Sequence, residues 1–120
     1  MEFRGKTAVI TGGASGIGLA LARRLTSIGA RVILFDVSDG PLEAAVSELR
    51  DGGGDAKYYA GDVSNPENIE ALAEFAWAEN GRADVIINNA GVGGPLQRVI
   101  NADLAEARKL FEVNYWGMWH

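Results

Sequence analysis

The sequence predicts an α/β protein built on a doubly wound parallel sheet, and three observations lead to this fold class. Short apolar runs alternate with longer segments of helical periodicity along the 120 residues. The run at 31–35 contains four consecutive apolar residues, which is typical of a strand buried on both faces. A glycine-rich stretch at 12–18 follows the first apolar run. Because crossovers are right-handed, we expect four strands in the order 3-2-1-4, each followed by a helix.

The first half of the chain is expected to form two strands, at residues 7–11 and 31–35, each followed by a helix. Gly29 is expected to end the first helix, and Pro41 suits the first turn of the second. The apolar residues at helical spacing in the first helix are Ile17, Leu21, Leu25 and Ile28. The expected inner stripe of the second helix is Leu42, Ala45, Val46 and Leu49, before a stop at Gly52, Gly53 and Gly54.

The second half repeats this pattern, with strands expected at residues 56–60 and 84–88. Between them, Ser64 and Glu67 fit a capping box at the start of the third helix. The inner residues expected for that helix are Ile69, Leu72, Ala73 and Ala76. A fourth helix is expected to begin near Asn101 or Asp103, with its inward residues being Leu104, Ala107, Leu110 and Phe111.

Composition and charge favour a single globular domain over residues 1–120 and exclude several kinds of site. The net charge of −5 disfavours nucleic acid as a partner, because phosphates are repelled. The chain has no cysteine and one histidine, His120, which excludes a cysteine or histidine metal cluster and a Ser-His-Asp triad within one chain. No apolar run reaches the ~18 residues that span a bilayer, and no signal peptide is visible. We therefore expect a cytoplasmic protein with no membrane partner.

The glycines between the first strand and the first helix predict a phosphate-binding loop. Gly12, Gly16 and Gly18 have the spacing Gly-x3-Gly-x-Gly, which differs from G-x-G-x-x-G and lacks the Lys-Ser/Thr of a P-loop. Glycines allow a tight turn and the close approach of a ligand, while the helix directs its free N–H groups at an anion. Ser15 adds a hydroxyl donor. The alternative is a turn that merely joins a strand to a helix.

Asp36, which follows the second apolar run, predicts the kind of nucleotide that binds. A carboxylate at this position accepts hydrogen bonds from both hydroxyls of the adenosine ribose and repels a 2′-phosphate. Val37 and Ser38 provide no arginine that would reverse this preference. The pattern therefore favours NAD over NADP as the cofactor, the alternative being a solvated turn aspartate.

Four motifs in chain order make the sequence resemble the short-chain dehydrogenase/reductase family. They are the Thr-Gly-x3-Gly-x-Gly loop at 11–18, Asp62-Val63 after the third strand, Asn88-Asn89-Ala90-Gly91 ending the fourth, and Asn114 in the fourth helix. The resemblance covers essentially the whole chain and implies the first half of a Rossmann-type fold. It implies a cofactor site, with Asp62 beside the adenine, formed by Gly12, Ser15, Gly16, Ile17, Gly18, Asp36, Asp62, Val63, Asn89, Ala90 and Gly91. Asn88 is at least as well explained by a structural role in hydrogen bonding to neighbouring loops.

The same resemblance implies catalytic residues that this sequence does not contain. Family members transfer a hydride between nicotinamide and an alcohol or carbonyl carbon, using a serine and a Tyr-x3-Lys pair. Here Tyr58, Tyr59 and Tyr115 are followed four positions later by Asp62, Val63 and Trp119, so the pair is missing. Asn114 is the one remnant of the family's active-site set.

The sequence thus favours an NAD(H)-binding half of an oxidoreductase without hydride-transfer activity of its own. One alternative is an oxidoreductase subunit that a partner chain completes with the serine, tyrosine and lysine. Another is a non-catalytic structural or interaction protein, or a gene remnant. A homo-oligomer is also expected, because the fourth strand would have an open outer edge and Trp116 and Trp119 share a face of the last helix.

Overall fold

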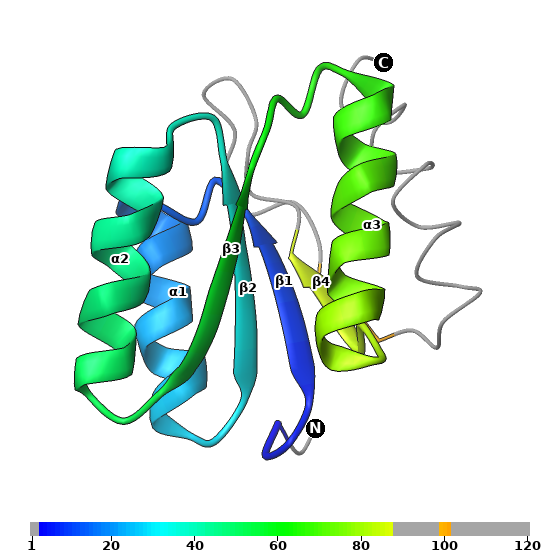
Figure 1. The fold of residues 1–120 in the computed structure, drawn as a ribbon. Helices are drawn as coiled ribbons and strands as arrows, with labels where there is room; N and C mark the ends of the chain where they lie inside the picture. The colour runs from blue at the N-terminus through cyan, green and yellow to red at the C-terminus, as the bar shows by residue number, and fades with distance from the viewer. Residues whose placement is uncertain (1–2, 88–98, 102–120) are drawn as a thin grey trace.

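The computed structural model, which describes residues 3–87 and 99–101, contains one sheet with helices on both faces (Figure 1). The sheet order is β3-β2-β1-β4-β5, so the predicted order 3-2-1-4 is confirmed. The strands are β1 (Thr7–Thr11), β2 (Arg31–Asp36), β3 (Asp55–Ala60), β4 (Val85–Ile87) and β5 (Val99–Asn101). The helices are α1 (Gly16–Ser27), α2 (Asp39–Asp51) and α3 (Pro66–Asn80). Helices α1 and α2 cover one face of the sheet, and α3 covers the other (Figure 1).

The central strands β1 and β2 are buried because both of their faces carry apolar side chains. They pair in parallel with Val9 beside Ile33 and Ile10 beside Leu34. Ile10 and Leu34 belong to the cluster under α1 and α2, whereas Val9 and Ile33 belong to the cluster under α3. Because side chains alternate between the two faces of a strand, one apolar run contributes residues to both hydrophobic cores.

The prediction that the fourth strand has an open outer edge is wrong for the described part of the chain. Strand β5 pairs antiparallel with β4, placing Asn101 beside Val85 and Val99 beside Ile87. Its backbone takes the hydrogen-bonding edge that would otherwise invite another chain. Asn101 is therefore in a strand rather than at the start of a helix. The remainder of the predicted fourth helix, including Trp116 and Trp119, lies outside the described residues.

The helices follow the predicted stripes, except at the start of α1. In α2 and α3 every predicted inner residue is buried. In α1 the buried residues are Gly18, Ala22 and Leu25, whereas Ile17 is 55% exposed. Ile17 lies in the first turn of α1, next to the loop rather than in the middle of the helix.

The start of α3 also differs from the prediction. The N-cap is Asn65, whose side chain accepts a hydrogen bond from the Glu67 amide at 2.9 Å. Pro66 takes the first helical position, which suits a residue without an N–H and moves the cap to the residue before it. The predicted capping box of Ser64 and Glu67 is therefore wrong. In the described part of the chain no helix is long and apolar enough to cross a membrane.

Candidate functional site

Three predicted site segments meet at one edge of the sheet, because parallel strands end on the same side. The glycine loop follows β1, Asp36 ends β2, and Asp62 follows β3. This edge lies at the upper end of the molecule in Figure 1, where the arrowheads of β1 and β2 point. In open α/β sheets this is the edge at which ligands bind.

The glycine loop is folded tightly against the end of β2. Gly12 and Gly16 have positive φ angles of 67° and 57°, which residues with a Cβ rarely adopt. The Gly13 amide donates to the Phe35 carbonyl at 3.2 Å. A Cβ on Gly13 would lie 2.9 Å from the Cβ of Leu34, so this position has no room for a side chain. Sequence reasoning missed Gly13, although a second glycine directly after Gly12 was a signal for close packing.

The loop leads directly into the N-terminus of α1. Ser15 is the N-cap, with extended backbone and no capping bond from its side chain. The first backbone hydrogen bond of the helix runs from the Leu19 amide to the Ser15 carbonyl at 3.3 Å. The amides of Gly16, Ile17 and Gly18 come before it and so have no carbonyl within the helix. Together with the helix dipole they form a local donor group for an anion.

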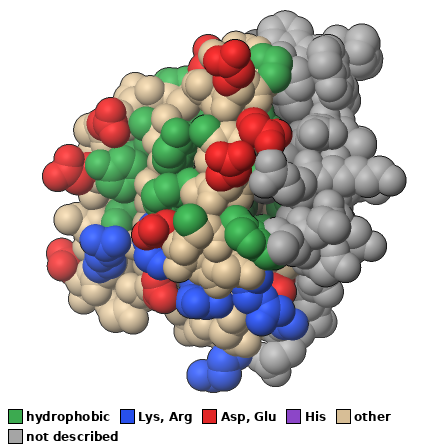
Figure 2. Space-filling view, turned by 45° about the vertical axis from the view of Figure 1, so that its right-hand side comes forward, with side chains coloured by type: hydrophobic (Ala, Val, Ile, Leu, Met, Phe, Trp, Pro, Cys, Tyr) green, Lys and Arg blue, Asp and Glu red, His purple; other side chains and the backbone are tan. Residues whose placement is uncertain are grey.

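On the face that Figure 2 shows, the surface charge does not add to this attraction. Figure 2 shows the Lys and Arg side chains of that face gathered at its lower end, while Asp and Glu side chains prevail at the upper end. The upper end is the one at which β1 and β2 finish (Figure 1). On this face, an anion at the upper end would therefore meet mainly acidic side chains, and the backbone donors would have to provide the attraction.

Asp36 is held between the loop and its own backbone. Its Oδ2 accepts a hydrogen bond from the Ala14 amide at 3.1 Å, and its Oδ1 accepts one from the Val37 amide at 2.8 Å. Its carbonyl accepts from the Gly61 amide at 2.8 Å, which ties the residue to the end of β3. Val37, directly after it, is 66% exposed. The Ala14 contact was not foreseen from the sequence, because nothing in the spacing marks a bond from a side chain to a distant amide.

Asp62 is fixed by a turn of its own. Its Oδ1 accepts from the Ser64 amide at 2.8 Å and from the Ser64 hydroxyl at 2.7 Å. These two hydrogen bonds, the hydroxyl's foremost, lower the pKa of the Asp62 carboxyl. The Asp62 amide donates to Asn68 Oδ1 at 2.8 Å. Val63, beside it, is half-buried against the α3 core. The carboxylate thus stays charged at neutral pH, at the edge where the other site segments end.

The remaining predicted site residues fall outside the part of the chain that the structure describes. They are Asn89, Ala90 and Gly91 after β4, together with Asn114. Asn88 lies outside it as well. Among the described residues no group of three or more His, Cys, Asp or Glu side chains is placed to hold a metal ion.

Comparison with known proteins identifies the family. A family model described as short chain dehydrogenase matches residues 6–120. The chain belongs to the short chain dehydrogenase family. It is 41% identical to 1-deoxy-11-beta-hydroxypentalenate dehydrogenase of Streptomyces avermitilis, over 100% of this chain and 45% of the relative. It is 34% identical to 7alpha-hydroxysteroid dehydrogenase of Escherichia coli K12, over 100% of this chain and 46% of the relative.

Solved structures of the family agree with the fold. A short chain dehydrogenase/reductase from Burkholderia phymatum in complex with NAD has a TM-score of 0.75 and 43% identity, covering 78% of this chain and 33% of that one. A metagenomic short-chain oxidoreductase in complex with NADP has a TM-score of 0.72 and 44% identity, covering 79% and 44%. The chain therefore spans less than half the length of the relatives it matches.

Proposed function

We propose that this chain is the dinucleotide-binding part of a short chain dehydrogenase oxidoreductase and that it binds NAD(H). The observation that carries the proposal is the meeting of the glycine loop, the N-terminus of α1 and the Asp36 carboxylate at one sheet edge. Similar family structures in complex with NAD and with NADP support a nicotinamide dinucleotide as the ligand. In family members this cofactor accepts or supplies the hydride.

The donors and acceptors of the site fit the parts of such a molecule. The amides of Gly16, Ile17 and Gly18 would hold the pyrophosphate, with the exposed Ser15 hydroxyl beside them. Gly16 has open space where a Cβ would stand, so a ligand can approach the backbone closely. Asp36 would accept from the adenosine ribose. Asp62 and Val63 would lie beside the adenine, as the family resemblance implies.

The proposal gives NAD(H) preference over NADP(H) because of charge. A 2′-phosphate at the ribose would approach the Asp36 carboxylate, and two negative charges at that distance repel. Val37 and Ser38, which follow Asp36, carry no positive charge to offset the repulsion. Asn89, Ala90 and Gly91 are proposed for the sugar on the nicotinamide side from their family motif alone.

Hydride transfer is proposed only for an assembly that holds more than these 120 residues. The sequence has no Tyr-x3-Lys pair, so a general acid for an alcohol or carbonyl substrate is missing from it. Asn114 would belong to the active site, and the serine, tyrosine and lysine would have to come from other residues. By itself the chain is expected to bind the cofactor without turnover.

Calorimetric titration of the 120-residue chain with NADH and with NADPH tests the proposal. We expect saturable NADH binding and clearly weaker NADPH binding, with no oxidation of NADH when simple ketones or aldehydes are added. Equal affinity for the two nucleotides would remove Asp36 as the selector. If neither nucleotide binds to the folded chain, the glycine loop serves only to join β1 to α1, and a structural or interaction role is favoured.

A further inference from the structure

Two consecutive amides of the glycine loop are bound by two consecutive residues at the end of β2. The Gly13 amide donates to the Phe35 carbonyl at 3.2 Å, and the Ala14 amide donates to Asp36 Oδ2 at 3.1 Å. The first bond joins backbone to backbone and would survive any substitution that keeps the strand. The second depends on the Asp36 side chain. Residue 36 therefore determines whether the Ala14 amide is hydrogen-bonded to the end of β2, beside the packing of Ala14 against the core under α1 and α2.

The place of Ala14 in the chain makes this attachment relevant to the ligand. Ala14 is followed by Ser15, the N-cap, and by Gly16, the first residue of α1, whose φ is 57°. The segment that joins β1 to α1 is the four residues 12–15, and Ser15 alone separates Ala14 from the helix. Fixing the Ala14 amide limits the directions in which the Gly16 amide and those after it can point.

The Asp36 carboxylate can hold the loop and a ribose at the same time. An ionised carboxylate has about four acceptor positions on its two oxygens. The Ala14 amide uses one on Oδ2, and the Val37 amide uses one on Oδ1. Each oxygen keeps a position for one hydroxyl of a vicinal diol. A bound nucleotide would therefore not have to displace the Ala14 amide.

We propose that Asp36 is a positioning residue for the glycine loop, because its carboxylate fixes the Ala14 amide before any nucleotide binds. This inference rests on the proposed function, since the loop matters here as the phosphate site. Through the loop, Asp36 then favours the binding of every dinucleotide, and this contribution opposes its repulsion of a 2′-phosphate. A residue that only selects between ribose and 2′-phosphoribose would act differently, because its removal would relieve the repulsion of NADPH.

The first test is amide hydrogen exchange, measured by NMR on the nucleotide-free 120-residue chain. In Asp36→Ala we expect the Ala14 amide to exchange about tenfold faster or more, because it loses a hydrogen bond to a charged group. The Gly13 and Gly61 amides, which donate to backbone carbonyls, should keep their rates relative to the rest of the sheet and serve as internal references. Unchanged exchange at Ala14 would overturn the proposal.

Two further variants make this test robust. Asp39→Ala removes the same charge from the exposed first turn of α2 and should leave the Ala14 rate as it is. Asp36→Asn keeps the size of the side chain and one carbonyl oxygen, so it covers the case in which the alanine variant fails to fold. A neutral acceptor is weaker, so we expect an increase at Ala14 that is smaller than in Asp36→Ala. An Asp39→Ala effect as large as that of Asp36→Ala would assign the change to charge and overturn the proposal.

The second test compares nucleotide affinities by calorimetry. In Asp36→Ala we expect weaker binding of both NADH and NADPH, because the loss of the positioned loop should outweigh the relieved repulsion of the 2′-phosphate. An increase in NADPH affinity would show that selection dominates and would overturn the positioning role. The exchange measurement needs no nucleotide. If the wild-type chain binds neither nucleotide, the proposed function fails, but the exchange rates of the Ala14 amide still show whether Asp36 holds it. If NADH binds and the Ala14 rate does not respond to Asp36→Ala, the proposed function stands and this inference fails.

Discussion

Asp84 and Thr7 exchange two hydrogen bonds at the edge of the sheet opposite the candidate site. The Thr7 amide donates to Asp84 Oδ2 at 2.9 Å, and the Asp84 amide donates to the Thr7 carbonyl at 2.9 Å. Asp84 is only 5% exposed, and its Oδ1 accepts from Arg82 Nε at 2.8 Å. This aspartate therefore joins the starts of β1 and β4 with its side chain as well as its backbone.

Asp84→Ala is expected to lower the free energy of unfolding by about 2–4 kcal/mol, because it leaves the Thr7 amide buried without its acceptor. Asp84→Asn keeps one oxygen for Thr7 but turns an amide toward the arginine, so its loss should be smaller. Urea unfolding of the three chains measures both values. Since the site lies at the other ends of the strands, NADH affinity of the folded variants should match the wild type. An alanine variant as stable as the wild type would contradict the contact.

Gly13 offers a test of the close packing of the loop. A methyl group there would lie 2.9 Å from Leu34 Cβ and 3.1 Å from the Ile10 carbonyl oxygen. We expect Gly13→Ala to cost about 1–3 kcal/mol of stability, as overpacking usually does, and to weaken NADH binding because the loop must shift. The matched control is Gly40→Ala in α2, where nothing lies within 4 Å of the added methyl. Thermal unfolding and calorimetry of the two variants compare them, and equal effects would refute the packing argument.

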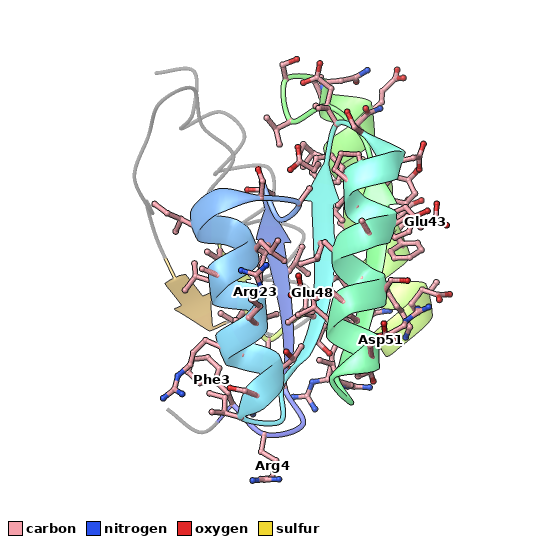
Figure 3. The ribbon with its side chains drawn as sticks, turned by 90° about the vertical axis from the view of Figure 1, so that its left-hand side faces the viewer. Phe3, Arg4, Arg23, Glu43, Glu48 and Asp51 are labelled. Atoms are coloured by element: carbon pink, nitrogen blue, oxygen red, sulfur yellow. The ribbon has the colours of Figure 1, made fainter. Side chains whose placement is uncertain are left out.

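The ion pair between Arg23 of α1 and Glu48 of α2 predicts a small pH-dependent contribution to stability (Figure 3). The hydrogen bond from Arg23, more than its charge, lowers the pKa of Glu48 from its ordinary value of 4.5. A carboxyl with a lowered folded pKa stabilises the protein above its unfolded pKa, and this contribution is lost as the pH falls through the folded value. Both side chains are about half exposed, at 53% and 49%, so solvent screening keeps the effect small.

Glu48→Gln should therefore lower Tm slightly at pH 7, and its difference from the wild type should shrink as the pH falls below 4.5. Glu43→Gln, a carboxylate that Figure 3 shows on the side of α2 away from α1, is the matched control. It should leave Tm almost unchanged at pH 7. Scans of Tm against pH for the three chains provide the measurement. A difference for Glu48→Gln that grows toward acid pH would be evidence against the pair.

The sheet and its helices could be predicted because each strand and helix carries its own apolar pattern. The consecutive apolar residues of β2 indicate burial on two faces, and the stripes of α2 and α3 point to the core. Strand β5 has only three residues, too few for a periodic signal that would predict its antiparallel pairing with β4. The cap at Asn65 shows a different limit, since Ser64 fits the motif equally well and Pro66 decides between them.

The geometry of the candidate site could be predicted where glycines carry the signal, and not where a side chain binds distant backbone. The positive φ angles at Gly12 and Gly16 agree with the spacing of the loop. The hydrogen bond from the Ala14 amide to Asp36 joins residues 22 positions apart. Its donor is a backbone amide, which leaves no signal in the sequence, and the sequence singles out Asp36 only as a ribose ligand. Contacts of this kind become visible only when the loop and the strand end are placed together.

The exposed position of Val37 provides the last test, because a positive charge there should shift the nucleotide preference toward NADP(H). Its side chain is 66% exposed, so an arginine can replace it without disturbing the core, and its backbone amide still donates to Asp36 Oδ1. In Val37→Arg the guanidinium would meet a 2′-phosphate and offset the Asp36 charge. We expect the ratio of NADPH to NADH affinity to rise about tenfold, as for a hydrogen bond between charged groups. Val37→Gln, long but neutral, should leave the ratio near the wild-type value. If both variants change the ratio equally, side-chain length rather than charge governs the choice, and the placement of the ribose beside Asp36 loses its support.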